Sequence, residues 1–175
     1  TTHQQYAWEK LILSGDLGFQ NNHREEWSAF HTHYDTQVMP AKDPDRELVF
    51  KLHTFSSSLK LRLFNSSSWE HMAGWNMQIQ KNAIGGYSFL LPEYKRFITG
   101  AFWLTTFRLD NQLSVTGGIR YDRGRIDITA FEDPYLVEYL HRQGYEEEVI
   151  QAYRWRSYPV DRAYGNYSCS AGVVW

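Results

Sequence analysis

The stretch "LSVTGGIRYDRGRIDI", residues 113–128, alternates apolar and polar positions almost without a break. One set of alternate positions holds Leu113, Val115, Gly117, Ile119 and Tyr121, and the other holds Ser114, Thr116, Gly118, Arg120 and Asp122. Successive side chains of a β-strand point to opposite faces of the sheet, so the pattern predicts a strand with one apolar and one polar face. The question that follows is whether the apolar face lies against a protein core or against lipid.

The same two-residue period occurs in five further segments. We predict six strands, at 8–21, about 48–64, 68–82, about 95–109, 113–128 and 164–175. In the other five strands, the apolar positions hold Leu11, Leu13, Leu17 and Phe19; Leu59, Leu61 and Leu63; Trp69, Ala73, Trp75, Met77 and Ile79; Phe97, Trp103 and Phe107; and Tyr167, Cys169, Ala171 and Val173.

The connections between these strands alternate in length. Tight turns are predicted at "NSSS" (65–68) and "LDNQ" (109–112), and the other three connections are medium or long. Alternate connections of an up-and-down meander lie at opposite ends of the sheet, so one end carries only tight turns. Transmembrane β-barrels show this asymmetry.

The last connection, the insertion 129–162, has helix signals of its own. They predict a helical hairpin, with one helix at 133–143 and a second at about 145–154. The signals are Asp133 and Pro134 at the start of the first helix, Gly144 at its end, Glu146–Glu148 at the start of the second, and Arg154 and Arg156 near its end.

Composition narrows the class of protein. The 175 residues suit one unit, 1–175, and the net charge of −2 gives no basic footprint for nucleic acid. The single cysteine excludes an intrachain disulfide, and no stretch approaches the ~20 apolar residues of a membrane-spanning helix. The start, "TTHQQYAWEK", lacks a signal peptide, so we expect a cytosolic protein or a mature or shortened piece of an exported one.

Aromatic residues make up 17% of the chain, although its mean hydropathy is −0.55. Trp and Tyr collect where membrane meets water, so two aromatic girdles are predicted. One consists of Trp8, Phe64, Trp69, Phe107 and Trp175, and the other of Phe19, Tyr87, Tyr94, Tyr121 and Tyr164. The polar faces suit a barrel lumen and carry Lys10, Asp16, Lys60, Arg62, Glu70, Gln78, Gln80 and Arg120. Alternation alone fits a soluble antiparallel barrel or sandwich equally well.

Four segments, in order along nearly the whole chain, resemble the barrel of TonB-dependent outer-membrane receptors. "LSVTGGIRYDRGRID" resembles their GxRYD strand, and "GWNMQIQKNAIGGYSFLLPEYKRFITGAFW" resembles a strand with a Q-x-N ending and an FLxP loop. "DLGFQNNHREEWSAF" is similar to the strand ending in Q-x-N-x-R-x-E, here Gln20, Asn22, Arg24 and Glu26. "VDRAYGNYSCSAGVVW" resembles the S-x-S-x-G strand, here Ser168, Ser170 and Gly172.

The resemblance implies an all-β antiparallel up-and-down meander, part of a transmembrane β-barrel, with a helical hairpin in one long loop. It implies a location in the outer membrane of a Gram-negative bacterium and import of a scarce nutrient, most simply an iron complex or siderophore. Such receptors work with a plug domain, a TonB box and the TonB complex inside a barrel of about 22 strands. No plug or TonB box precedes Thr1, so we expect a fragment of the barrel.

Candidate site residues are few. The polar-face residues Gln78, Gln80, Arg120 and Asp122 either line a substrate path or bond across strands. The aromatic residues Tyr145, Tyr153, Trp155 and Tyr158 either form a ligand platform or pack the two helices. "HTHYD" supplies His31, His33 and Asp35 as metal-ligand candidates, although a metal site needs three or four convergent ligands. No catalytic motif can be placed, so neither enzyme activity nor a cofactor is predicted.

Two other functions stay open at this stage. One is a soluble antiparallel barrel or sandwich that binds an apolar ligand or a glycan, and the other is a metal-dependent enzyme using His31, His33 and Asp35. In the barrel hypothesis, the first and last strands lack neighbours and the apolar faces lack lipid. The isolated chain should then form an oligomer in water.

Overall fold

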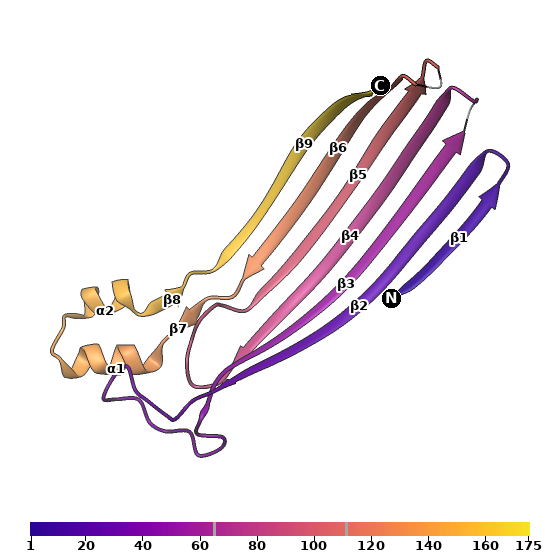
Figure 1. Cartoon of the computed structure of the whole chain (residues 1–175). Coiled ribbons are helices and arrows are strands. Elements are labelled where there is room, and N and C mark those ends of the chain that lie inside the picture. Colours follow the sequence, from indigo (N-terminus) through magenta and orange to yellow (C-terminus); the bar gives the residue numbers. More distant parts are fainter. Residues whose placement is uncertain (65, 111) are drawn as a thin grey trace.

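A computed structural model describes residues 1–64, 66–110 and 112–175. Its main feature is one long antiparallel sheet with the order β1-β2-β3-β4-β5-β6-β9, in which neighbours in the chain are neighbours in the sheet except across the β6–β9 insertion (Figure 1). The strands are β1 (Thr2–Trp8), β2 (Leu11–Trp27), β3 (Arg46–Phe64), β4 (Trp69–Gly85), β5 (Tyr94–Arg108), β6 (Ser114–Ile128) and β9 (Val160–Val174). The predicted all-β antiparallel meander is confirmed.

The sheet has one strand more than the six predicted. The segment 8–21 does not form a first, edge strand: β1 precedes it and pairs with Leu11–Leu17 of β2 across a two-residue turn. The turn residues are Glu9 and Lys10, which lack the Asn-Gly or Asp-Gly signature of short hairpins, and the glutamines of β1 hide its alternation. The edges of the described sheet are therefore β1 and β9. Strand β9 also begins at Val160, earlier than the predicted 164.

The two ends of the sheet differ as the connection lengths predict. The β1–β2, β3–β4 and β5–β6 connections lie together at one end of the sheet. The segments 28–45, 86–93 and 129–159 lie at the other end (Figure 1). Parts of the predicted turns 65–68 and 109–112, namely residues 65 and 111, lie outside the described residues. In the second turn, the Asp110 carboxylate accepts hydrogen bonds from the backbone N–H groups of Gln112 (2.7 Å) and Leu113 (2.8 Å).

Apart from the last pair of β2 and β3, after Glu26, the pairing register places the odd-numbered residues of β2 to β6 and β9 on one face. For example, Leu59 lies opposite Trp75, Trp75 opposite Ala101, and Ala101 opposite Tyr121. We call this the odd face, and we call the opposite one, with Asp16, Lys60, Glu70, Gln78 and Arg120, the even face. Tyr6 and Trp8 of β1 also lie on the odd face, because they pair with Leu13 and Leu11.

Burial is inverted relative to a protein folded in water. On the odd face, Trp75, Ile79, Trp103 and Ile119 are exposed, and Ile119 is 64% exposed. On the even face, Glu70 is only 7% exposed, and Thr54 and Asn82 are also buried. Of the large apolar side chains in the described part of the chain, only Leu48, Val49 and Ile150 are buried, and all three lie near the loop end.

Aromatic side chains form two rows on the odd face, although not with the predicted members. Trp8, Trp69 and Phe107 mark the short-turn end, with the rings of Trp69 and Phe107 4.5 Å apart. At the other level, the register aligns Phe19, Phe55, Ile79 and Phe97. The prediction is wrong for Phe64, Tyr94 and Tyr164, which lie on the even face, and for Tyr121, which lies at mid-sheet.

The predicted helical hairpin is present in the last long connection. It consists of α1 (Pro134–Arg142) and α2 (Glu147–Tyr153), flanked by the short paired strands β7 (Phe131–Glu132) and β8 (Trp155–Ser157). The Asp133 carboxylate caps α1 by accepting from the N–H groups of Tyr135 (3.1 Å) and Leu136 (3.2 Å). Arg156, predicted near the end of α2, lies instead in β8.

In the part of the chain that the structure describes, no helix is long and apolar enough to cross a membrane.

Candidate functional site at the loop end of the sheet

The three long connections converge on a cavity of about 730 Å³. The Thr36 hydroxyl, which is buried, donates to the Tyr135 carbonyl oxygen at the start of α1 (2.7 Å) and so ties the 28–45 segment to the insertion. Arg156 joins the same two segments, because its guanidinium donates to both the Tyr34 hydroxyl and the Asp133 carboxylate. The lining residues that offer aromatic faces or polar groups are His33, Tyr34, Gln37, Tyr87, Phe89, Phe131, Tyr135 and Arg156.

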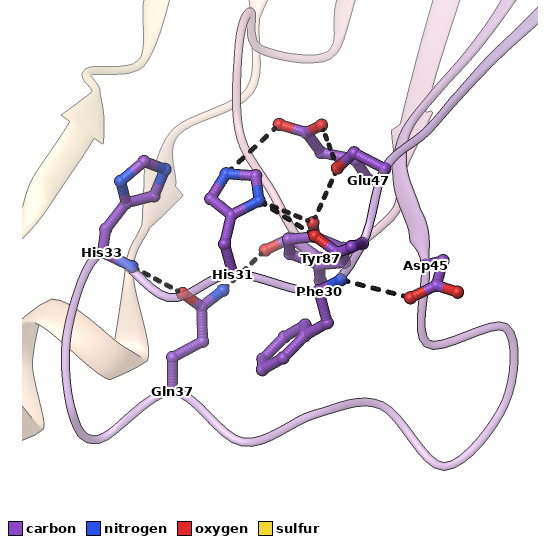
Figure 2. A network of polar contacts seen from close by, with 9 residues as sticks. Phe30, His31, His33, Gln37, Asp45, Glu47 and Tyr87 are labelled. Atoms are coloured by element: carbon purple, nitrogen blue, oxygen red, sulfur yellow. Dashed lines mark hydrogen bonds and ion pairs between the residues drawn. The ribbon is translucent and has the colours of Figure 1, made fainter.

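A second set of polar contacts anchors the base of the 28–45 segment, and Figure 2 shows it from close by. The Ser28 hydroxyl donates to the Glu47 carboxylate (2.7 Å) and lies 3.2 Å from the Tyr87 hydroxyl. The Tyr87 hydroxyl lies 3.3 Å from His31 Nδ1, and His31 Nε2 lies 3.8 Å from a Glu47 carboxylate oxygen. Gln37 donates to the Tyr87 carbonyl oxygen (3.1 Å). These contacts join the first long segment to the 86–93 connection.

Gly86 lets that connection lie close to β3. Its φ of +94° is in the left-handed region, and a Cβ there would lie 2.2 Å from the Glu47 carbonyl oxygen. The backbone N–H of Ser88 then donates to that same carbonyl oxygen (3.0 Å). A residue other than glycine would push the connection away from the strand.

The metal-ligand candidates do not form a metal centre. The His31 and His33 rings pack edge to face 5.5 Å apart, and Asp35 is exposed in a turn. His31 is engaged by Tyr87 and Glu47, and nowhere in the described ranges do three His, Cys, Asp or Glu side chains come together as ligands. A metal-dependent enzyme therefore has no geometric support at this position.

The even-face candidates form hydrogen bonds to other side chains of that face, within a strand or across strands. Arg120 donates to both Asp122 oxygens (2.6 and 2.5 Å) and to Asn76 (3.0 Å). Gln78 accepts from Arg96 (3.1 Å), and Gln80 donates to the Thr54 hydroxyl (3.1 Å). The four side chains share one polar face, as a substrate path would require, and each of them also bonds to a neighbouring side chain.

Two polar clusters on the even face were not singled out as sites from the sequence. Glu70 accepts from Arg62 and from Arg108 (2.7 Å) near the short-turn end. Near mid-sheet, Asp16 lies 2.5 Å from His3 Nδ1 and accepts from the Ser58 hydroxyl (2.8 Å). Ser58 bonds to Asp16 and not to the imidazole, so this is not the arrangement of a catalytic triad. Only knowledge of the register places these partners side by side.

The aromatic candidates of the insertion face outward. Tyr145, Tyr153 and Tyr158 are exposed, with Tyr153 at 67%, while Ile150 of α2 is buried. Trp155 is half-buried under the Arg154 guanidinium, which lies 4.7 Å from its ring. The structure thus leaves the tyrosines available at the surface and does not use them to pack the hairpin.

Comparisons of the chain with models of protein families, with curated proteins and with solved structures found no match.

Proposed function

We propose that this chain forms part of the wall of a transmembrane β-barrel in an outer-membrane receptor of the TonB-dependent type. The odd face contacts lipid, the even face lines the lumen, and the loop end lies outside the cell. The observation that carries the proposal is a charge-free band on the odd face. From Phe19, Phe55, Ile79, Phe97 and Tyr121 to the short-turn end, the odd positions of β2 to β6 hold no Asp, Glu, Lys or Arg.

The height of this band supports a membrane origin. On β5 it runs from Phe107 to Phe97, which is roughly 33 Å of extended strand. At a strand tilt of about 40°, this projects to about 25 Å, the height of the apolar band of outer-membrane barrels. The aromatic rows at both of its limits match the girdles of such barrels.

The loop end supports a receptor role. The cavity of about 730 Å³ has the size of a small-molecule pocket and combines aromatic faces with the polar ends of Tyr34, Gln37 and Arg156. By its resemblance to TonB-dependent receptors, the chain would help to import a scarce nutrient such as an iron complex. A plug domain and the TonB complex would then supply the movement, and the strands of this chain would supply the wall.

The single cysteine allows a direct test of which face meets lipid. Cys169 lies on the odd face opposite Ile119, and Ser170 is the next residue, on the even face. The chain is refolded into phosphatidylcholine vesicles with a nitroxide label on Cys169 or, in the variant C169S/S170C, on residue 170. Paramagnetic resonance then measures the collision of each label with oxygen, which partitions into lipid, and with a water-soluble nickel chelate.

The proposal predicts that the label at 169 collides mainly with oxygen and the label at 170 mainly with the nickel chelate. If both labels collide equally with the chelate, the odd face does not contact lipid and the proposal fails. A monodisperse, vesicle-free monomer in which the label at 169 is shielded from both probes and the label at 170 is not would instead indicate a soluble barrel or sandwich.

A further inference from the structure

Basic side chains border the charge-free band on its loop side. In the next row of the odd face, the register places His53 opposite Lys81 and Lys81 opposite Lys95. All three side chains are exposed, and within the described ranges no carboxylate forms an ion pair with either lysine. Like charges directly opposite one another destabilise a sheet, so the Lys81–Lys95 pair favours an anion beside it, and within the chain Asp127 lies opposite Lys95 alone.

A surface hollow lies beside this row, one to two rows nearer the short-turn end, where Arg125 is opposite Phe97 and Arg123 is opposite Thr99. Its volume is about 610 Å³, and it is lined by Phe97, Thr99, Arg123, Arg125, Asp161 and the small residues Gly124 and Ala163. Arg125 donates to both oxygens of Asp161 (2.8 and 2.5 Å) and so neutralises that carboxylate. Arg123 is exposed and forms no ion pair with any described residue. The hollow therefore presents one free guanidinium beside an already neutralised pair.

The lysine pair and the hollow are adjacent. Arg125 lies opposite Phe97, so Lys95, two residues along β5, is its diagonal neighbour at roughly 7–8 Å between backbones. Asp127 lies opposite Lys95 on its other side, but the two are not within ion-pair distance. Together, Lys81, Lys95, Arg123 and Arg125 form what we call the basic belt. On each of β4, β5 and β6, the belt begins at the first odd-face position beyond the charge-free band.

We propose that the basic belt binds the phosphate-bearing headgroup of a membrane lipid. The inference rests on the proposed function, because the belt lies at the membrane–water interface only if the odd face contacts lipid. A phosphate in the hollow accepts from Arg123, compensates the Lys81–Lys95 repulsion, and leaves its acyl chains on Phe97 and the apolar band. Among phosphate ligands, a lipid is the one that uses both the charge of the belt and its continuity with the apolar face.

The test compares two double variants with equal loss of charge. R123Q/K95Q removes two cations from the belt, and K60Q/R162Q removes two exposed cations from the even face. Each protein is refolded in zwitterionic detergent, and its affinities for phosphatidic acid, phosphatidylcholine and inorganic phosphate are measured by native mass spectrometry. The nitroxide labels at Cys169 and, in C169S/S170C, at residue 170 report separately on whether the odd face contacts lipid.

The wild-type chain should bind phosphatidic acid more tightly than either other probe. R123Q/K95Q should weaken that affinity about 5- to 25-fold, since each basic residue contributes roughly fivefold near an anionic surface, and K60Q/R162Q should not change it. Equal affinities for phosphatidic acid and inorganic phosphate would overturn the lipid assignment. So would an unchanged affinity in R123Q/K95Q, provided that the labels still show the odd face in lipid. Loss of that label pattern would instead count against the proposed function.

Discussion

The two faces of the sheet solve the same problem of burial in opposite ways. On the even face, Glu70 accepts hydrogen bonds from Arg62 and Arg108 of the two neighbouring strands, and Asp122 accepts from Arg120 of its own strand. On the odd face, Trp103 and Ile119 stay exposed although they are apolar. In water, the exposed apolar side chains would cost free energy in proportion to their area, roughly 25 cal/mol per Å². The proposed contact of the odd face with lipid would account for this difference.

The strongest way to break this comparison is to place a charge in the middle of each face. Ile119→Arg puts a guanidinium in the charge-free band, and we expect it to lower the free energy of unfolding in phosphatidylcholine vesicles by about 2–4 kcal/mol. Ser170→Arg, which lies at nearly the same height on the even face, should change it by less than about 1 kcal/mol. Denaturant titrations of the refolded chain measure both values. Equal costs would mean that the faces do not differ in their surroundings.

Two glycines sharpen the comparison by packing alone. A Cβ at Gly100 would lie 2.1 Å from an Asp122 oxygen and 2.9 Å from Arg120 Nη2, so the even-face cluster must move. We expect Gly100→Ala to destabilise the chain by about 1–3 kcal/mol. Gly117, on the odd face, has no heavy atom within 4 Å of its Cβ position, and Gly117→Ala should leave stability unchanged or raise it by up to about 1 kcal/mol. Thermal unfolding of both variants shows whether the even face is the packed one.

The helical insertion offers a third contrast, between its two helix starts. Asp133 caps α1 through its side chain, whereas Glu146 at the start of α2 makes no side-chain cap bond. Asp133→Ala should therefore destabilise α1 by about 1 kcal/mol, and Glu146→Ala should have little effect. Amide hydrogen exchange of 134–142 reports the change locally. Faster exchange in Glu146→Ala than in Asp133→Ala would contradict the assignment of the cap.

The smallest expected effect is at the short-turn end. Two backbone N–H donors, from Gln112 and Leu113, hold the pKa of Asp110 below its ordinary value. A lowered pKa in the folded chain means that the carboxylate stabilises the turn above the unfolded pKa, near 3.9, and that this contribution is lost as pH falls through the folded value. A carboxyl NMR titration should give a midpoint below 3.9. In Asp110→Asn, the amides of 112 and 113 should lose their pH dependence in that range.

The sequence predicted the sheet well because one rule, the two-residue period, governs it. Leu59, Trp75 and Ile119 were assigned to apolar faces strand by strand, and the register places all of them on one face. Strand β1 escaped prediction, because glutamines occupy both of its faces and Glu9–Lys10 carries no turn signature. The prediction of Tyr94 and Tyr164 as girdle members is wrong because it rests on their aromatic rings and ignores that even-numbered positions lie on the even face.

The candidate site was harder to predict, since it depends on contacts between distant segments. Thr36 meets Tyr135, and Arg156 meets Tyr34, across about a hundred residues of chain that no local pattern connects. The requirement of Gly86 for a positive φ and a close approach to Glu47 follows only from the fold. The basic belt likewise exists only when β4, β5 and β6 are placed side by side.

The unbroken register has a consequence for how the length of this chain can vary. The β2–β3 pairing shifts only between Glu26 and Trp27, beyond the charge-free band, and the pairings from β3 to β9 run without a shift. Loss of one residue inside a strand would exchange the two faces from that point onward, whereas loss of two would preserve them. The segments 28–45, 86–93 and 129–159 are connections outside the sheet, so a change of one residue in their length does not exchange its faces. Insertions and deletions should therefore accumulate freely in these loops and enter the strands only in pairs.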